Sequence, residues 1–199
     1  MRMRLAVPVL LLALSAGAFR AAAEEAAPPA MDEAALKAIL ERMSPGPEHA
    51  ALMKQAGAYE IASKVWMDPA KPPEETKASA TFTAILEGRY LRQEFQGSMM
   101  GKPFTGLGIE GYDKEKKEYV CVWFDSMGLI PFTLRGKSAD GGKNIEYHGS
   151  LPCPMDGKEV KQRYTCQHLD ENTFTFTMYE TREGGKEVKG MEMTYTRKK

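Results

Sequence analysis

The sequence predicts an all-β protein, an antiparallel up-and-down barrel of about ten strands preceded by one or two short helices. The main observation is the stretch from Ala80 to Met127, in which four extended segments follow one another. Turn sequences separate them, at 87–88, 101–102 and 113–116. Strands joined by tight turns pair with their sequence neighbours, which predicts a meander. So many consecutive hairpins lose their exposed edges only when the sheet closes, and this favours a barrel.

Alternation of apolar and polar residues marks the expected strands. They cover about 58–67, 77–86, 89–100, 104–112, 118–125, 130–138, 143–151, 158–169, 172–182 and 186–197. Gly106, Gly108 and Gly111 in the fourth strand indicate a bend or a close approach of backbone, as barrel closure requires. The fifth strand is apolar on both faces, which predicts cover on both sides. The barrel interior covers one side, and the N-terminal helix or a dimer partner the other.

Two helices are expected before the first strand. Asp32 suits the N-cap of a helix that runs to about Met43, with an apolar stripe at helical spacing. Pro47 suits the first turn of a second helix, which is expected to end at Gly57.

The first residues read as a targeting signal. Arg2 and Arg4 precede an apolar run over 5–18 that is too short to span a bilayer, and small residues follow at 21–23. We therefore expect a signal peptide at 1–23, an extension with an amphipathic helix at 24–47, and the barrel domain at 48–199. A retained membrane anchor is the alternative. Export predicts a periplasmic or secreted protein without a membrane span after signal removal.

Composition excludes some classes of partner. Basic and acidic residues balance at 27 each, whereas nucleic-acid binding needs a basic excess or patch. The three cysteines, Cys121, Cys153 and Cys166, cannot all pair within the chain. We expect no obligatory disulfide, and Cys121–Cys166, on strands taken to be neighbours, is the pair to test.

Several segments carry a family resemblance. GPEHAALMKQAGAYE (46–60), GRYLRQEFQGSMMGKPFTGLGIEGYD (88–113), WFDSMG (123–128) and MEMTYTRK (191–198) resemble the domain-of-unknown-function family 1579. That family is similar to the calycins, the barrel superfold of lipocalins and fatty-acid-binding proteins. Many relatives have Trp where this chain has Tyr59. The resemblance implies a calycin-like fold but no activity, because function resides in sites and not in folds.

Metal and haem sites are minor hypotheses. His148, Cys153 and Met155 surround a Pro-rich loop and offer soft ligands suited to Cu(I). Haem-binding calycins such as nitrobindins use a barrel histidine, for which His148 or His168 is available. No matching motif supports either role, and structural roles for these residues are favoured. We therefore expect no metal and no cofactor.

No catalytic set stands out in the sequence. A nucleophile elbow and a Cys–His pair are both missing from its motifs. Asp125 or Glu94 is available as the general base of a small hydrolase or isomerase. A turn role for Asp125 and an ordinary ion pair for Glu94 are the simpler interpretations.

The leading hypothesis is a barrel that binds a small, mainly apolar molecule, with catalysis as the alternative. A third possibility is a structural or assembly module in which the fifth strand packs on another chain, for example in a homodimer. The residues expected to line the cavity or its mouth are Gln93, Trp123, Asp125, Met127, Tyr147 and Phe176.

Overall fold

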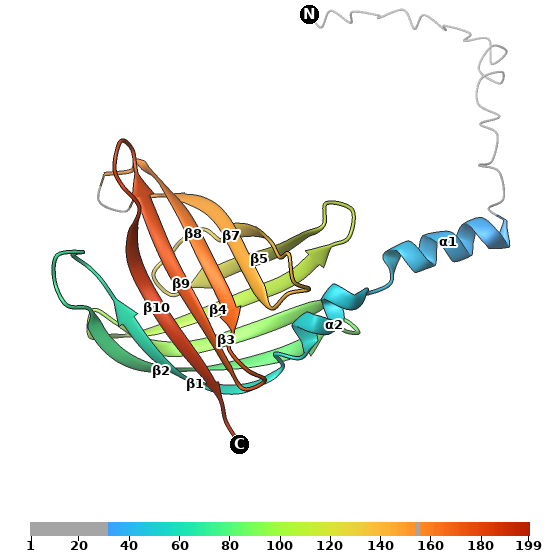
Figure 1. Cartoon of the computed structure of the whole chain (residues 1–199), viewed down its shortest axis with the longest axis horizontal. Helices are drawn as coiled ribbons and strands as arrows, with labels where there is room; N and C mark the ends of the chain where they lie inside the picture. The colour runs from blue at the N-terminus through green and yellow to red at the C-terminus, as the bar shows by residue number, and fades with distance from the viewer. Residues whose placement is uncertain (1–31, 154–155) are drawn as a thin grey trace, which may run out of the picture. The chain divides into compact units, whose positions relative to one another are not determined.

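Ten antiparallel strands close into one barrel (Figure 1). The structure is a computed structural model that describes residues 32–153 and 156–199. Each strand pairs with its neighbours in sequence, and the first pairs with the last. The predicted fold class is therefore confirmed. The expected signal peptide lies outside the described residues.

The strand boundaries agree with the predicted ones to within a few residues. The strands are β1 (Gly57–Val65), β2 (Glu74–Ile85), β3 (Tyr90–Met99), β4 (Lys102–Asp113), β5 (Glu118–Asp125), β6 (Phe132–Lys137), β7 (Asn144–Pro152), β8 (Glu159–His168), β9 (Thr173–Arg182) and β10 (Val188–Arg197). Met67 and Leu86, which alternation places in strands, lie outside them. Both side chains are exposed, and Leu86 has a φ of 49° in the turn between β2 and β3.

The register fixes which side chains point inward. Residues paired across neighbouring strands share a face, so inward positions can be followed around the barrel. Tyr59 opposes Ala80, which opposes Phe95, and all three are buried. β1 and β10 close the circle through pairs such as Ile61 with Tyr195. An aromatic core results, in which the rings of Phe174 and Tyr195 stack at 4.3 Å between centroids.

Helix α2 (Pro47–Met53) covers one end of the barrel, which we call the α2 end (Figure 1). Leu52 is only 1 % exposed there. Nδ1 of His49, also buried, accepts a hydrogen bond from the Gly46 amide at 3.0 Å and so satisfies a free helix-terminal donor. The helix ends at Met53 and not at Gly57, which is the first residue of β1. The opposite end, which we call the far end, carries the connections 66–73, 100–101, 126–131 and 183–187, together with the described residues between β7 and β8, Cys153 and 156–158.

Helix α1 (Glu33–Met43) precedes α2. The Asp32 carboxylate accepts a hydrogen bond from the Ala35 amide at 2.6 Å, so the predicted N-cap is confirmed. Among the described residues, no helix is long and apolar enough to cross a membrane.

Candidate functional site: the barrel interior

Part of the apolar interior surface stays accessible. Several inward-facing side chains pack against the buried core but are only partly buried: Met99, Trp123, Phe132, Phe176, Met178, Met191 and Met193. Aromatic rings and methionines together make a surface that adapts to apolar molecules of varied shape, because the thioether chain is flexible and polarisable.

A carboxyl group points into this apolar interior. Glu110 lies on β4 at a position that pairs with Leu91 on one side and Cys121 on the other. The Tyr147 hydroxyl, contributed by β7, donates a hydrogen bond to Glu110 Oε1. Part of the residue's surface is accessible, but the carboxyl lies deep in the protein. Burial raises the pKa of Glu110 to about 7, although the hydrogen bond from Tyr147 opposes the shift.

The groups around Glu110 hold their protons at neutral pH. Burial raises the pKa of the Cys121 and Cys166 thiols, and of the Tyr147 phenol, well above their ordinary values. Burial likewise raises the pKa of Tyr119 to about 12. In the described part of the chain, no Lys, Arg or His contributes to the pKa shift of Glu110. Glu110 is therefore the member of this group that gains or loses charge near pH 7.

Two further sets of polar side chains are hydrogen-bonded inside the barrel. Gln93 Nε2 donates to the Tyr195 hydroxyl at 3.2 Å. The Tyr164 hydroxyl donates to Gln162 Oε1 at 2.7 Å, and Gln162 Nε2 donates to Glu180 Oε1 at 3.2 Å. These donors and acceptors thus satisfy one another, as buried polar groups must.

Basic side chains occupy inward positions only near the strand ends in the described residues. Lys102 and Arg182 stand at the far end, and His168 and Arg197 at the α2 end. Arg197 lies over the Tyr59 ring and donates to the carbonyl oxygens of Ala56 and Lys54. The interior around Glu110 therefore has a carboxyl group without a cation beside it.

Asp125 connects the interior to the loop at the far end. Its Oδ2 accepts from Trp123 Nε1 at 3.0 Å, and its Oδ1 accepts from the amides of Met127 and Gly128 at 2.9 and 2.8 Å. Exposed apolar residues surround this end on three connections: Met67, Met100, Met127, Leu129 and Ile130. A small pocket of about 200 Å³ lies at the same end, between Cys153, Val160 and Arg182.

The structure brings most of the sequence-predicted residues to the interior. Gln93, Trp123, Tyr147 and Phe176 face inward, and Asp125 bonds to Trp123 at the far end. Met127 is 57 % exposed and lies on the connection from β5 to β6.

Several of the alternatives that the sequence leaves open do not fit the geometry. Glu94 faces outward and pairs with Arg92 at 3.1 Å, so it has no place in an interior reaction. His148 is also on the outer face, where it contacts Glu146 at 2.9 Å, whereas Cys153 is buried in a loop. His148 and Cys153 therefore lie on opposite sides of the barrel wall and do not form the soft-ligand cluster of the minor copper hypothesis, and Met155 lies outside the described residues. His168 faces inward at the α2 end beside Phe174.

The cysteines also differ from expectation in one respect. Cys121 on β5 and Cys166 on β8 are not on neighbouring strands, because β6 and β7 lie between them. All three cysteines are free thiols.

Glu110 is the functional candidate that sequence reasoning missed. The fourth strand contains Phe104, Gly106, Gly108, Glu110 and Tyr112 at alternate positions. Two of the inward positions of this strand are glycines, which carry no apolar side chain. Alternation of apolar and polar residues alone therefore does not show that Glu110 shares the inward face. The parity of Phe104 and Tyr112 is the signal that places Glu110 inside.

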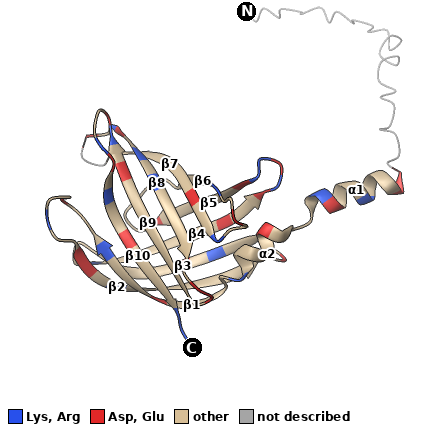
Figure 2. Cartoon of the chain, viewed as in Figure 1, with Lys and Arg blue, Asp and Glu red and all other residues tan. Residues whose placement is uncertain are grey.

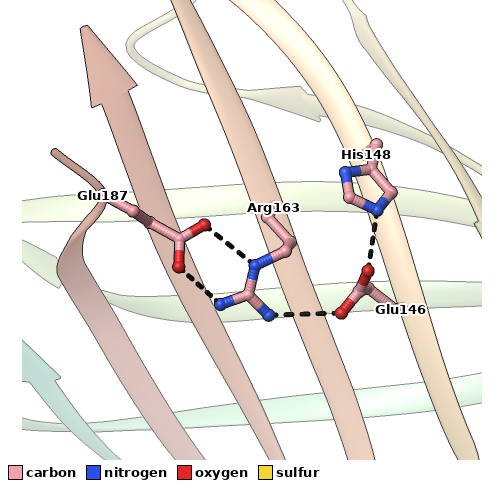
Figure 3. A network of polar contacts seen from close by, with 4 residues as sticks. All are labelled: Glu146, His148, Arg163 and Glu187. Atoms are coloured by element: carbon pink, nitrogen blue, oxygen red, sulfur yellow. Dashed lines mark hydrogen bonds and ion pairs between the residues drawn. The ribbon is translucent and has the colours of Figure 1, made fainter. Parts of the chain in front are cut away.

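Lys and Arg are interspersed among Asp and Glu along the strands and turns, so neither sign of charge gathers in one part of the barrel (Figure 2). One network joins three elements (Figure 3). Arg163 on β8 binds both carboxylate oxygens of Glu187, at 2.9 and 2.7 Å, and approaches Glu146 on β7 at 3.3 Å. Its guanidinium also lies 4.1 Å from the centroid of the Tyr179 ring. The connection before β10 is thereby fixed to the barrel wall.

Comparison with known proteins places the fold. The crystal structure of Rv2717c from M. tuberculosis is similar with a TM-score of 0.57 at 16 % identity, covering 78 % of this chain and all of that one. The S-type phycobiliprotein lyase CPES from Guillardia theta is similar with a TM-score of 0.52 at 12 % identity, covering 75 % of this chain and 92 % of that one. At such identities the likeness concerns the fold alone. No curated protein matches.

The family model described as "Protein of unknown function (DUF1579)" matches residues 44–197, which include α2 and all ten strands. The chain therefore belongs to this family.

Proposed function

We propose that the barrel binds a small, mainly apolar organic molecule in its interior. The observation that carries the proposal is the partly accessible lining of aromatic and methionine side chains around the Glu110–Tyr147 pair. Burying apolar ligand surface against such a lining is worth roughly 25 cal/mol per Å². A few hydrogen-bonding groups inside an apolar site orient the ligand, as in typical small-molecule sites.

A dye-binding experiment tests this location. Nile red, a neutral apolar dye, is expected to bind the wild-type protein with enhanced emission. Met193 faces inward and Thr194 faces outward on β10. Met193→Trp is expected to weaken dye binding because it fills the interior, whereas Thr194→Trp adds the same ring outside. Equal binding by both variants would place the dye on the outer surface and contradict the proposal.

Native mass spectrometry of the protein recovered after export tests it without a chosen probe. A retained organic mass that is lost in Met193→Trp supports interior binding. The retained mass would indicate the chemical class of the bound molecule.

Proton transfer is a second candidate function, which the raised pKa of Glu110 favours. A carboxylate in an apolar site is a stronger base than in water, and a pKa near 7 suits general-base catalysis. The probe is 5-nitrobenzisoxazole, which loses its ring C–H proton to a base while the N–O bond breaks to give a cyanophenolate. Catalysed ring opening that rises through pH 7 and is lost in Glu110→Gln supports this function. Equal rates for both proteins contradict it.

We also propose that the chain is exported and that residues 1–23 are removed. The basic start, the short apolar run and the small residues at 21–23 support this. The intact mass of protein recovered from the periplasm or medium tests it, and a mass that includes Met1 contradicts it.

Self-association is a further part of this proposal. On the outer face of β5, Phe124 is 43 % exposed and adjoins the partly buried Val122, an apolar strip that suits a second copy. Sedimentation of the mature protein tests this, and a monomer at every concentration contradicts it.

A further inference from the structure

The polar groups inside the barrel restrict which apolar molecules it can accept. This step rests on the proposed interior binding and concerns the chemistry of the ligand's polar group. A ligand with an apolar body can carry one of three kinds of polar group: an acid, a neutral alcohol or an amine. Glu110 and its neighbours discriminate among them.

An acidic ligand is disfavoured by what surrounds Glu110. A buried carboxylate needs a cation or several donors, since desolvation of an unpaired charge is costly. The described interior offers cations only near the strand ends, and Arg197 there is engaged with two carbonyl oxygens. A second carboxylate beside Glu110 would add repulsion between like charges.

The free acceptor capacity of Glu110 favours a donor. A carboxylate has about four lone-pair positions, and the structure fills one of them with the Tyr147 hydroxyl. Polar groups near Glu110 include the Cys121 and Cys166 thiols and the Tyr119 phenol, which stay neutral at pH 7. Among the described residues of this region, a positively charged donor on the ligand would therefore pair with the Glu110 carboxylate, and no protein cation would compete for it.

We propose that the barrel selects an apolar amine, whose ammonium group forms an ion pair with Glu110 while its hydrocarbon part contacts the aromatic and methionine lining. Charge-assisted hydrogen bonds are about twice as strong as neutral ones, so the amine gains over an alcohol of the same length. Tyr147 holds the carboxylate in place by donating to one of its oxygens.

The proton balance makes binding depend on pH. As pH falls through 7, Glu110 becomes protonated, and each ammonium ion that binds the protonated form displaces one proton to the solvent. Affinity for the amine is therefore expected to rise as pH rises from 5 to 8. The facing groups, Tyr119, Cys121, Tyr147 and Cys166, do not titrate in that range.

The test compares octylamine, octan-1-ol and octanoic acid, measured by calorimetry on the full mature chain at pH 8. Octylamine is expected to bind at least about tenfold more tightly than either of the others, which corresponds to about 1.4 kcal/mol. Glu110→Gln is expected to remove this preference, so that octylamine no longer binds more tightly than octanol. Glu180→Gln, which alters another inward-facing carboxyl, is the matched control and is expected to keep the preference.

The possible results separate this inference from the proposed function. If none of the three probes binds, interior binding itself fails. If octanol or octanoic acid binds as tightly as octylamine, binding stands and amine selection is overturned. Loss of the preference in Glu180→Gln but not in Glu110→Gln also overturns it. Should Glu110→Gln fail to fold, the pH dependence of octylamine binding to the wild-type protein decides, and an affinity that does not rise between pH 5 and 8 counts against the proposal.

Discussion

The six-membered ring of Trp123 lies over Gly106 on the neighbouring strand, in the space that a larger residue would fill with its Cβ. The indole nitrogen of the same side chain donates to Asp125 at 3.0 Å. Glycine and tryptophan thus form one packing unit, in which the missing side chain makes room for the ring and the carboxylate fixes its orientation.

Gly106→Ala is expected to destabilise the barrel by about 1–3 kcal/mol, the usual cost of forcing extra volume into a packed interior. Gly108→Ala is the matched control, because its added Cβ would lie 3.3 Å from Trp123 and 3.4 Å from Gln93, which is tight but tolerable. Urea unfolding followed by circular dichroism measures both. A loss in Gly108→Ala as large as that in Gly106→Ala would show that the closer approach of Trp123 to Gly106 does not set the cost.

Asp125→Ala is expected to cost about 1–3 kcal/mol because two backbone amides and the Trp123 indole lose their acceptor. Indole emission should shift to longer wavelength as Trp123 gains access to water, measured with Trp66 replaced by Phe. Asp113→Ala is the control, since Asp113 also accepts from two turn amides but has no such bond to a tryptophan. Its emission should stay unchanged, and a similar shift in both variants would refute the assignment.

The pKa of Glu110, raised to about 7, predicts an unusual pH dependence of stability. The folded state binds the proton more tightly than the unfolded chain, whose glutamate titrates near 4.5. The contribution of this group is therefore fully present below pH 4.5 and is lost as pH rises through 7, by on the order of 3 kcal/mol. The neighbouring Tyr119, Cys121, Tyr147 and Cys166 stay neutral over this range.

Glu110→Gln should therefore flatten the stability profile between pH 4.5 and 7 and leave the variant more stable than the wild type at pH 8. Urea midpoints at several pH values measure this. Parallel profiles for the two proteins would show that Glu110 titrates normally.

Glu187→Gln breaks the paired hydrogen bonds to Arg163 shown in Figure 3, and we expect a loss of at most about 1 kcal/mol because the pair is solvent-accessible. The hydrogen bond from Arg163 lowers the pKa of Glu187, so its contribution exists above pH 4.5 and fades as pH falls through the lowered value. Thermal unfolding at low and high salt measures the loss, which should shrink with salt. Glu183→Gln in the same connection should have no such salt-dependent effect.

The three cysteines are expected to remain free thiols in the purified protein under oxidising conditions. Cys153 and Cys166 are buried and Cys121 is partly buried, so iodoacetamide should modify all three only in denaturant. Intact mass measures the number of adducts. If the denatured protein carries one adduct and not three, two of its cysteines form a disulfide. The Cys121–Cys166 pair would then be the one to map.

Strand alternation is sufficient to predict the barrel because most inward positions are apolar and most turns contain Gly, Asn or Asp. The same rule places Gln93, Trp123, Tyr147 and Phe176 inside. It fails at Glu110, where a polar side chain stands at an inward position next to glycines. It also fails at Met67 and Leu86, which continue the apolar alternation after the backbone has left the strand. The bond between Glu110 and Tyr147 joins β4 to β7, and no local pattern reports such a contact.

The pairing of β1 with β10 has a consequence for how the chain acquires its fold. Tyr59 pairs with Arg197 on β10, so the barrel cannot close during synthesis until β10 has left the ribosome. Such non-local pairing slows folding and leaves β1 and β9 as open edges until then. The first half of such a chain cannot complete the barrel alone, and the pairing of β10 with β1 and β9 is the step that closes it.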